Sequence, residues 1–193
     1  MPDTLLLEVG CDEIPARYLP LAVSDLEAKA GAALTAARMS FDSVKTYGTP
    51  RRLALIVAGL ADSSQDAVTK VRGPSKKAAY DQEGNPSRAL QGFARSLGIE
   101  PLQVTVEEEG GGEYIYGERH EKGRPAAAVL AEVLPQVVMG LESPYPLRWG
   151  DENWRWYRPI RWVVCLYGKY IVPLSIAGIA SCRNTYGHRT LHP

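Results

Sequence analysis

Two long stretches with helical spacing, set among short β-type runs, restrict the fold of this 193-residue chain most. Apolar residues recur three or four positions apart from Ala16 to Met39, just after Pro15, and again from Ala126 to Met139. Each stretch therefore places its apolar side chains on one helical face. Aliphatic or alternating runs typical of strands surround both stretches. These runs lie at residues 5–9, 43–47, 53–60, 102–106, 114–119, 163–166 and 170–176.

A third helix is predicted near the middle of the chain. Asn85 and Pro86 have the residue types favoured at an N-cap and at the first helical position. Helical spacing continues to Leu97, and Gly98 is expected to end the helix. Helices and strands thus alternate without the regular spacing of a doubly wound parallel sheet. We therefore expect an α+β fold with three main helices and a mixed or antiparallel, hairpin-rich sheet.

The segments between these elements are predicted as turns and loops. Gly48-Thr49-Pro50 is expected to connect two strands of a hairpin, and the glutamate- and glycine-rich residues 107–112 are expected to connect two more. Residues 70–77, with the sequence KVRGPSKK, are predicted as a basic loop. The chain length fits one medium domain or two small ones, with candidate boundaries near residues 65–85 and 140–153.

Charge and cysteine content restrict the classes of function. Lysine plus arginine and aspartate plus glutamate both number 22, so any contact with RNA must come from local patches. Three widely separated cysteines form neither a disulfide framework nor a zinc pair, which favours a reducing cytoplasm. The acidic N-terminus does not have the pattern of a signal peptide, and we expect no membrane segment. The polar residues from Thr185 onward have no pattern of a helix or strand, and we expect them to be a boundary within a larger protein.

The sequence contains no common catalytic motif. The patterns GxSxG, HExxH and GxxxxGK[ST] are all missing. Glu8, Asp12 and Glu13 have no companion histidine, and we interpret Asp12 and Glu13 as favouring the positive end of the helix behind Pro15. A carboxylate pair for metal binding or acid–base work is the alternative. We assign no catalytic residue and no metal ligand.

Two basic segments are candidates for contact with phosphate. Lys70, Arg72, Lys76 and Lys77 lie between Thr69 and Ala79 with no acidic residue among them. Such a patch attracts nucleic acid, but a solvated loop explains it equally well. The adjacent pair Arg51-Arg52 fits acidic groups on a protein partner as well as phosphate.

All four tryptophans lie between residues 149 and 162, interleaved with arginines. Tryptophan and arginine together suit RNA or a partner protein, because ring faces stack on bases and guanidinium groups bind phosphate. The alternative is a small core covered by arginines. We expect Trp162, which precedes an apolar run, to pack inward, and Trp154 and Trp156 to point outward.

Seven short sequences, in order, resemble the beta subunits of the bacterial two-subunit glycyl-tRNA synthetases. They are LLLEVG from Leu5, TPRRLA from Thr49, GPS from Gly73, GFAR from Gly92, RWG from Arg148, RPIRW from Arg158 and TYGHR from Thr185. The resemblance covers nearly the whole chain. Cys11 replaces the family's usual threonine, and Tyr145-Pro146-Leu147 replaces its lysine before RWG.

The resemblance implies an α2β2 heterotetramer, an aminoacyl-tRNA synthetase that uses ATP to attach glycine to tRNA(Gly) for translation in the cytoplasm. In that family the alpha subunit carries the class II catalytic core, which uses ATP with Mg. The beta subunit contributes tRNA recognition and assembly with alpha. Residues 1–193 correspond to its N-terminal region, without the HD-like and anticodon-binding regions, and this region is expected to bind no cofactor.

The sequence therefore predicts a non-catalytic region that helps to bind the tRNA acceptor region and the alpha subunit. The alternative is a protein-interaction module that docks only on the alpha subunit and does not contact RNA. An independent hydrolase is disfavoured. The predicted RNA-binding residues are Arg51, Arg52, Lys70, Arg72, Lys76, Lys77, Arg148, Trp154, Arg155, Trp156 and Arg158.

Overall fold

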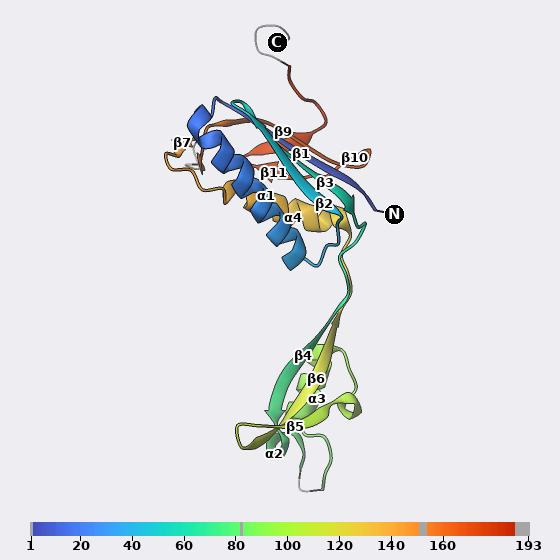
Figure 1. The fold of residues 1–193 in the computed structure, drawn as a ribbon. Coiled ribbons are helices and arrows are strands. Elements are labelled where there is room, and N and C mark those ends of the chain that lie inside the picture. Colours follow the sequence, from blue (N-terminus) through green and yellow to red (C-terminus); the bar gives the residue numbers. More distant parts are fainter. Residues whose placement is uncertain (1, 82, 151–153, 188–193) are drawn as a thin grey trace. The chain divides into compact units, whose positions relative to one another are not determined.

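The computed structural model describes residues 2–81, 83–150 and 154–187, which form two compact units (Figure 1). Unit 1 comprises Met1–Gln65 and Arg124–Pro193, and unit 2 comprises Asp66–Gly123. Unit 2 is therefore inserted into the chain of unit 1. Both units combine helices with mixed or antiparallel sheets, so the predicted α+β class is confirmed.

A seven-stranded sheet forms the centre of unit 1. Its order is β11-β12-β9-β1-β3-β2, with β10 also pairing with β9, and the pairs are antiparallel except β12 with β9. The predicted run at residues 170–176 is divided into β10 and β11, because Pro173 between them has no N–H to donate. The strands are β1 (Asp3–Cys11), β2 (Ser43–Thr49), β3 (Arg52–Leu60), β9 (Ile160–Tyr167), β10 (Tyr170–Ile171), β11 (Ser175–Ile176) and β12 (Ile179–Cys182).

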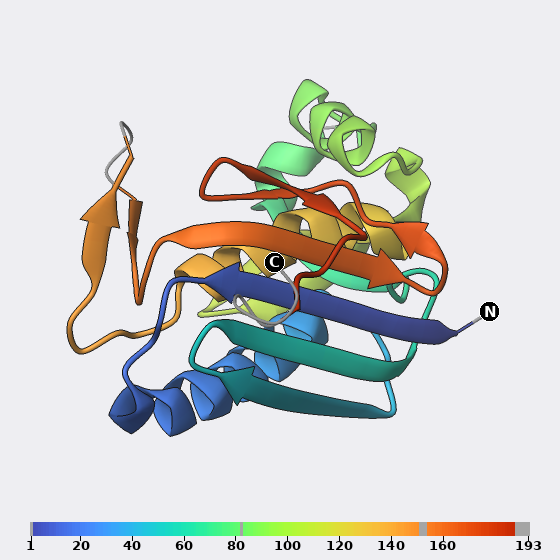
Figure 2. The same cartoon turned by 90° about the horizontal axis from the view of Figure 1, so that it is seen from above.

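Two helices, α1 (Leu19–Ala36) and α4 (Ala126–Met139), pack against one face of this sheet (Figure 2). The short 3-10 helix η1 (Ala16–Tyr18) precedes α1. Leu5, Leu7 and Val9 alternate along β1, point toward the helices and are almost fully buried. Burying each such side chain contributes about 1.5–3 kcal/mol, so this interface adds substantially to the stability of unit 1.

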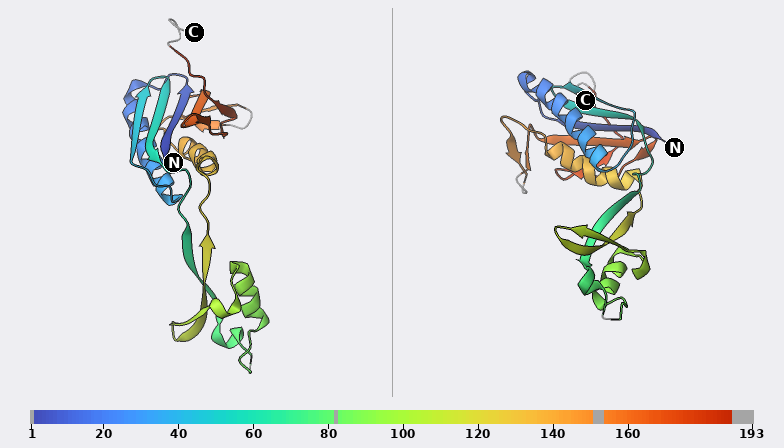
Figure 3. Two further views of the ribbon diagram at one scale, coloured as in Figure 1. Left: turned by 90° about the vertical axis from the view of Figure 1, so that its right-hand side faces the viewer. Right: turned by 60° about the horizontal axis from the view of Figure 1, so that its bottom comes forward.

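Unit 2 is a three-stranded antiparallel sheet with helices on one side (Figure 3). The strand order is β4-β6-β5, and α3 contacts β4 and β6. Its buried core is small and contains Ala79, Leu90 and Ile115. The elements are β4 (Ala67–Ser75), α2 (Lys76–Ala79), α3 (Arg88–Leu97), η2 (Pro101–Gln103), β5 (Thr105–Glu109) and β6 (Gly112–Glu121).

The predicted basic loop at residues 70–77 is wrong. Residues up to Ser75 belong to strand β4, and Lys76 and Lys77 begin the short helix α2. Arg72 lies opposite Tyr116 of β6, and the register shifts between Arg72 and Ser75. The Gly-Pro pair that suggested a loop therefore lies in a bulge, where a strand accommodates such residues.

Two boundaries in unit 2 also differ from the prediction. The N-cap of α3 is Ser87, whose hydroxyl accepts hydrogen bonds from the backbone N–H groups of Ala89 and Leu90 at 3.2 and 3.3 Å. Ser87 is a good N-cap residue, so the helix begins two residues after Pro86. Residues 107–109 are part of β5, and the turn is confined to Gly110 and Gly111, which have positive φ angles of 61° and 81°. Glycine adopts this conformation without steric cost.

Two of the three cysteines are shielded from reagents by unit 1. Burial raises the pKa of Cys11 and Cys165 to about 12, because it disfavours the thiolate. The reactive thiolate is thus scarce at both positions below about pH 10. We expect iodoacetamide at pH 8 to modify Cys182, which is half-buried on β12, and to leave the other two unmodified until the chain is denatured. Mass spectrometry would measure this, and rapid native labelling of Cys11 or Cys165 would contradict their burial.

No helix in residues 2–81, 83–150 and 154–187 is long and apolar enough to cross a bilayer.

Candidate nucleic-acid interface

A short hairpin of β7 (Leu147–Trp149) and β8 (Trp154–Trp156) contains most of the tryptophan and arginine segment. Trp149 lies opposite Trp154, and Arg148 lies opposite Arg155. Because side chains alternate across a strand, the two arginines point to one face and the tryptophans to the other. The hairpin, in orange in Figure 2, therefore has an aromatic face and a basic face.

The aromatic face packs into the core of unit 1. Trp156 is 1% exposed, and its indole Nε1 donates to the carbonyl oxygen of Val138 in α4 at 2.7 Å. Its ring meets Tyr157 edge-on at 5.7 Å. Trp149 and Trp154 are partly buried against the same core. The interpretation that Trp156 points outward is wrong, because β-strand alternation and the Val138 carbonyl hold its ring inside.

The basic face consists of Arg148 and Arg155, which we call the arginine pair. Both side chains are exposed, and within residues 2–81, 83–150 and 154–187 neither forms an ion pair. Arg158 is half-buried and donates from Nη1 to the carbonyl oxygen of Tyr157 at 2.6 Å. Of the predicted phosphate-binding residues in this segment, the arginine pair is thus the part that is exposed.

The cations of unit 2 lie beside carboxylates. Lys70 pairs with Glu107, and Lys76 Nζ is 2.9 Å from Glu113 Oε1. Arg72 Nη1 is 2.9 Å from an oxygen of Glu109. These groups are about half-exposed, so each pair adds only about 0–1 kcal/mol to stability. The pairs nevertheless offset the positive charge that the sequence indicated.

The same face of the unit 2 sheet contains two tyrosines between the cations and the carboxylates. The guanidinium carbon of Arg72 lies 3.7 Å from the centre of the Tyr114 ring, and Lys70 Nζ lies 4.9 Å from that of Tyr116. The hydroxyl of Tyr116 donates to Glu109 at 2.7 Å, which raises the pKa of that phenol. The cations of β4, the tyrosine rings of β6 and the carboxylates of β5 thus lie side by side across the three strands.

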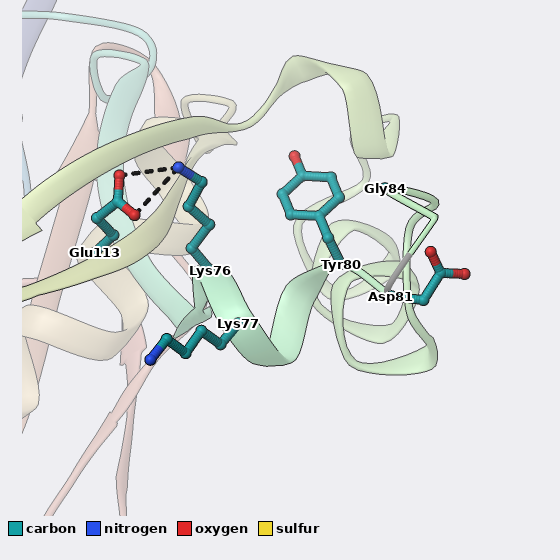
Figure 4. A pocket seen from close by; sticks show the side chains of 6 residues that line it. All are labelled: Lys76, Lys77, Tyr80, Asp81, Gly84 and Glu113. Carbon is teal, nitrogen blue, oxygen red and sulfur yellow. Dashed lines mark hydrogen bonds and ion pairs between the residues drawn. The ribbon is translucent and has the colours of Figure 1, made fainter.

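A shallow hollow of about 530 Å³ lies beside α2 (Figure 4). Lys76 and Lys77 line it together with Tyr80, Asp81 and Glu113. Figure 4 shows Lys76 directed toward Glu113 and Lys77 directed away from it. Backbone N–H groups of Asn85 and Glu83 donate to Asp81, which lowers its pKa. Lys77 is exposed and pairs with no carboxylate in the described part of the chain.

A group of interacting side chains lies on the sheet face of unit 1 that α1 and α4 do not cover. Glu8 is 8% exposed, and its Oε1 accepts hydrogen bonds from Trp162 Nε1 at 2.7 Å and from the hydroxyl of Thr185 at 2.5 Å. Arg52 Nη1 lies 3.4 Å from Glu8 Oε2, and Arg52 Nη2 donates to the carbonyl oxygen of Tyr186. We call Glu8, Arg52, Trp162, Thr185 and Tyr186 the sheet-face cluster.

The ring of Trp162 lies across the backbone of Gly10. A Cβ atom at Gly10 would be 2.0 Å from this ring, so a larger residue does not fit there. The Tyr186 ring lies 4.9 Å from the ring of Trp162 and the Arg52 guanidinium 5.7 Å from it. Trp162, expected to pack inward, thus packs on the face of the sheet opposite α1 and α4, outside the core that these helices cover.

Asp12 forms an ion pair with Arg161 of β9. Arg161 binds its carboxylate with both Nε and Nη2, at 2.9 and 2.6 Å. Such a bidentate pair is a strong charge-assisted contact, and the favourable position of Asp12 and Glu13 near the helix N-terminus stays a prediction. Arg51 is half-buried in the turn before β3, where its carbonyl oxygen accepts the backbone N–H of Cys11 at 3.0 Å.

Comparison with known proteins matches the chain to a family model described as glycyl-tRNA synthetase beta subunit, over residues 5–193. The chain belongs to the glycyl-tRNA synthetase beta subunit family. The glycine–tRNA ligase beta subunit of Desulforudis audaxviator (strain MP104C) is 44% identical over 191 residues, which cover 99% of this chain and 28% of that relative. That of Moorella thermoacetica (strain ATCC 39073 / JCM 9320) is 42% identical over 193 residues, which cover 100% of this chain and 28% of the relative. The chain thus spans about 28% of the length of these relatives.

Four of the seven sequences that resemble the glycyl-tRNA synthetase beta subunits meet in the sheet-face cluster. LLLEVG contributes Glu8, TPRRLA contributes Arg52, and RPIRW contributes Trp162. TYGHR contributes Thr185 and Tyr186, whereas His188 and Arg189 lie outside the described residues. From the sequence, Glu8 was considered only beside Asp12 and Glu13, as an alternative carboxylate pair, and Thr185 and Tyr186 were not indicated as a site. An acidic residue within an otherwise buried apolar strand is the pattern that marks such a position.

Proposed function

We propose that this chain is a non-catalytic region of glycine–tRNA ligase that helps to bind the acceptor region of tRNA(Gly) and to assemble the beta subunit with the alpha subunit in the cytoplasm. ATP and Mg²⁺ are used by the alpha subunit, and the complex is an α2β2 heterotetramer. Membership of the beta subunit family supports this assignment. The names of the relatives identify them as subunits of a ligase that acts on tRNA.

One structural observation carries the proposal: Glu8, the buried carboxylate among the described residues of unit 1, is engaged by neighbouring side chains. Glu8 accepts hydrogen bonds from Trp162 and Thr185 and lies beside Arg52, so neither carboxylate oxygen is directed at solvent for acid–base work. Exposed cations are present in both units: the arginine pair in unit 1 and Lys77 in unit 2 pair with no carboxylate in the described residues. A buried carboxylate held by its neighbours is poorly placed for acid–base chemistry, whereas exposed cations without a carboxylate partner can bind an anion.

Charge reversal at α2 tests the RNA contact. In the alpha–beta complex, Lys76→Glu/Lys77→Glu is expected to weaken tRNA(Gly) binding by roughly tenfold, because phosphate contacts are lost. For the same reason, the slope of log affinity against log salt concentration should become shallower by about 1 to 2. Filter binding at several salt concentrations measures both. The matched control is Arg88→Glu/Arg95→Glu, which reverses two exposed charges on α3 of the same unit. Equal effects of the two variants would show only non-specific attraction.

Docking on the alpha subunit alone is the second candidate, and an exposed apolar surface on unit 1 favours it. Tyr145 is 68% exposed, and Leu21 and Leu147 are each 47% exposed. The ring of Tyr145 lies 5.9 Å from that of Tyr18, next to Arg17. Exposed aromatic and aliphatic side chains beside an arginine are typical of protein interfaces.

Tryptophan fluorescence separates the two candidates. All four tryptophans lie in one segment of unit 1, so mixing the chain with alpha subunit or with tRNA reports on the same region. A response to alpha alone would favour docking without RNA contact. A response to tRNA alone, or to both, supports the RNA-binding role.

A further inference from the structure

We propose that the arginine pair binds one phosphodiester group of RNA between its two guanidinium groups, on the basic face of the β7–β8 hairpin. The inference rests on the proposed function, in which this region contacts tRNA. It adds the binding site and the chemical group that the site recognises.

The register of the hairpin places the two guanidinium groups together. Arg148 and Arg155 are directly opposite in an antiparallel pair, where Cβ atoms are about 4.5–5.5 Å apart. Their side chains point to the same face because they occupy the same rung of the ladder. Two forks of N–H donors therefore start from adjacent positions on one exposed face.

Among the described residues no carboxylate pairs with Arg148 or Arg155, whereas Arg161 and Arg72 each have one. Arg161 forms a bidentate pair with Asp12, and Arg72 lies 2.9 Å from Glu109. In the hairpin, Arg148 lies directly opposite Arg155, so each positive charge faces the other. Like charges directly opposite destabilise a strand pair, so an anion between them would relieve a repulsion already present in the fold.

The opposite face of the hairpin holds the arginine pair in place. Trp156, on the same strand as Arg155, is buried and donates to Val138 of α4. Trp149 and Trp154 flank the arginines in sequence and pack partly against the same core. A fixed backbone lowers the entropy lost on binding, which favours a defined site over a mobile patch.

Phosphodiester is the anion that matches this geometry best. Its two non-bridging oxygens share one negative charge and each can accept from a separate guanidinium group. Arginine is weakly hydrated and presents a planar fork, which suits phosphate better than the compact ammonium of lysine. Such a contact holds the RNA backbone and reads no base, so it should act on any tRNA.

The test uses the alpha–beta complex with Arg148→Ala/Arg155→Ala in the beta subunit. We expect the affinity for tRNA(Gly) to fall by about tenfold and the salt slope to fall by about 1, with the same loss for a non-cognate tRNA. Arg148→Lys/Arg155→Lys should recover only part of the affinity, because it restores charge but not the fork. Arg88→Ala/Arg95→Ala is the matched control and should leave both quantities nearly unchanged.

A stability measurement separates binding from a structural role. Because the alanine variant removes a like-charge opposition, its thermal midpoint should be equal to or higher than that of the parent complex. A lowered midpoint together with lost binding would overturn the proposal, since the arginines would then support the fold.

Two further outcomes are informative. Unchanged tRNA affinity and salt slope would overturn the phosphate site, and loss of alpha binding with tRNA binding intact would assign the arginine pair to an acidic protein surface. A beta subunit lacking residues 1–187 distinguishes this failure from that of the proposed function. If that deletion leaves tRNA binding unchanged, the proposed RNA role of the whole region fails; if it weakens binding and the double variant does not, only the phosphate site fails.

Discussion

Replacing Trp156 with alanine is expected to lower the free energy of unfolding by about 4 kcal/mol, within the range of about 3–5 kcal/mol for removal of a buried aromatic residue. The indole is 1% exposed and lies against α4 and Tyr157, so alanine leaves a cavity that the sheet and helix can close only in part. The Val138 carbonyl also loses the indole N–H as a donor. Urea unfolding followed by circular dichroism measures the change without relying on tryptophan emission.

Two variants divide this loss into its causes. Trp156→Phe keeps much of the ring and removes the N–H, so a smaller loss of about 1–2 kcal/mol is expected. Arg155→Ala, next in sequence but on the exposed face, should change stability by less than about 0.5 kcal/mol or raise it slightly. A loss below about 1 kcal/mol for Trp156→Ala would show that the ring is not in the core and would return it to the candidates for base stacking.

Local patterns were sufficient to predict the elements whose apolar residues repeat regularly. The helix predicted at residues 126–139 has the same bounds in the structure, because its apolar stripe is complete and Gly140 follows it. Strand β3 was predicted at residues 53–60 from its run of aliphatic residues, and its buried residues alternate from Leu53 to Val57. In both elements the pattern that the sequence shows is the pattern that the core buries.

Strand β4 could not be predicted in this way, because its stability comes from a distant partner. Residues 70–75 contain lysine, arginine and a Gly-Pro pair, which locally indicate a loop. Their strand conformation depends on pairing with β6, whose partner residues lie 39 to 48 positions later in the chain, with a bulge that accommodates Gly73 and Pro74. The neutralising carboxylates of Glu107 and Glu109 are equally distant, so the sequence overstated the positive charge of this segment.

The candidate site was predicted by residue type but not by orientation. Arginine and tryptophan alternate from residue 154 to residue 156, and this alternation alone requires them to face opposite sides. Which side is buried depends on the contact of Trp156 with Val138. The sheet-face cluster was missed because Glu8 lies 154 positions from Trp162, a separation at which no sequence spacing is informative.

Replacing Glu8 with alanine is expected to destabilise unit 1 by about 2–3 kcal/mol and to release the segment that follows β12. Removal of the carboxylate takes the acceptor from Trp162 Nε1 and Thr185 and leaves the Arg52 guanidinium without its neutralising partner. Leaving such groups unsatisfied costs more than the net value of the bonds themselves. The estimate stays below that for a fully buried ion pair, because the Arg52 side chain is 32% exposed.

Glu8→Gln keeps the shape and one carbonyl acceptor, so its loss should be about 1 kcal/mol, which separates the charge from the hydrogen bonds. Glu113→Ala breaks the exposed pair with Lys76 and should cost less than about 1 kcal/mol.

Trypsin cleavage after Arg183, two residues before Thr185, should become faster in Glu8→Ala because Thr185 and Tyr186 lose their contacts with the sheet. If cleavage and stability both matched those of Glu113→Ala, the sheet-face cluster would contribute no more than a surface ion pair. The larger expected effect follows from burial: at 8% exposure Glu8 has little water to replace the partners that it loses.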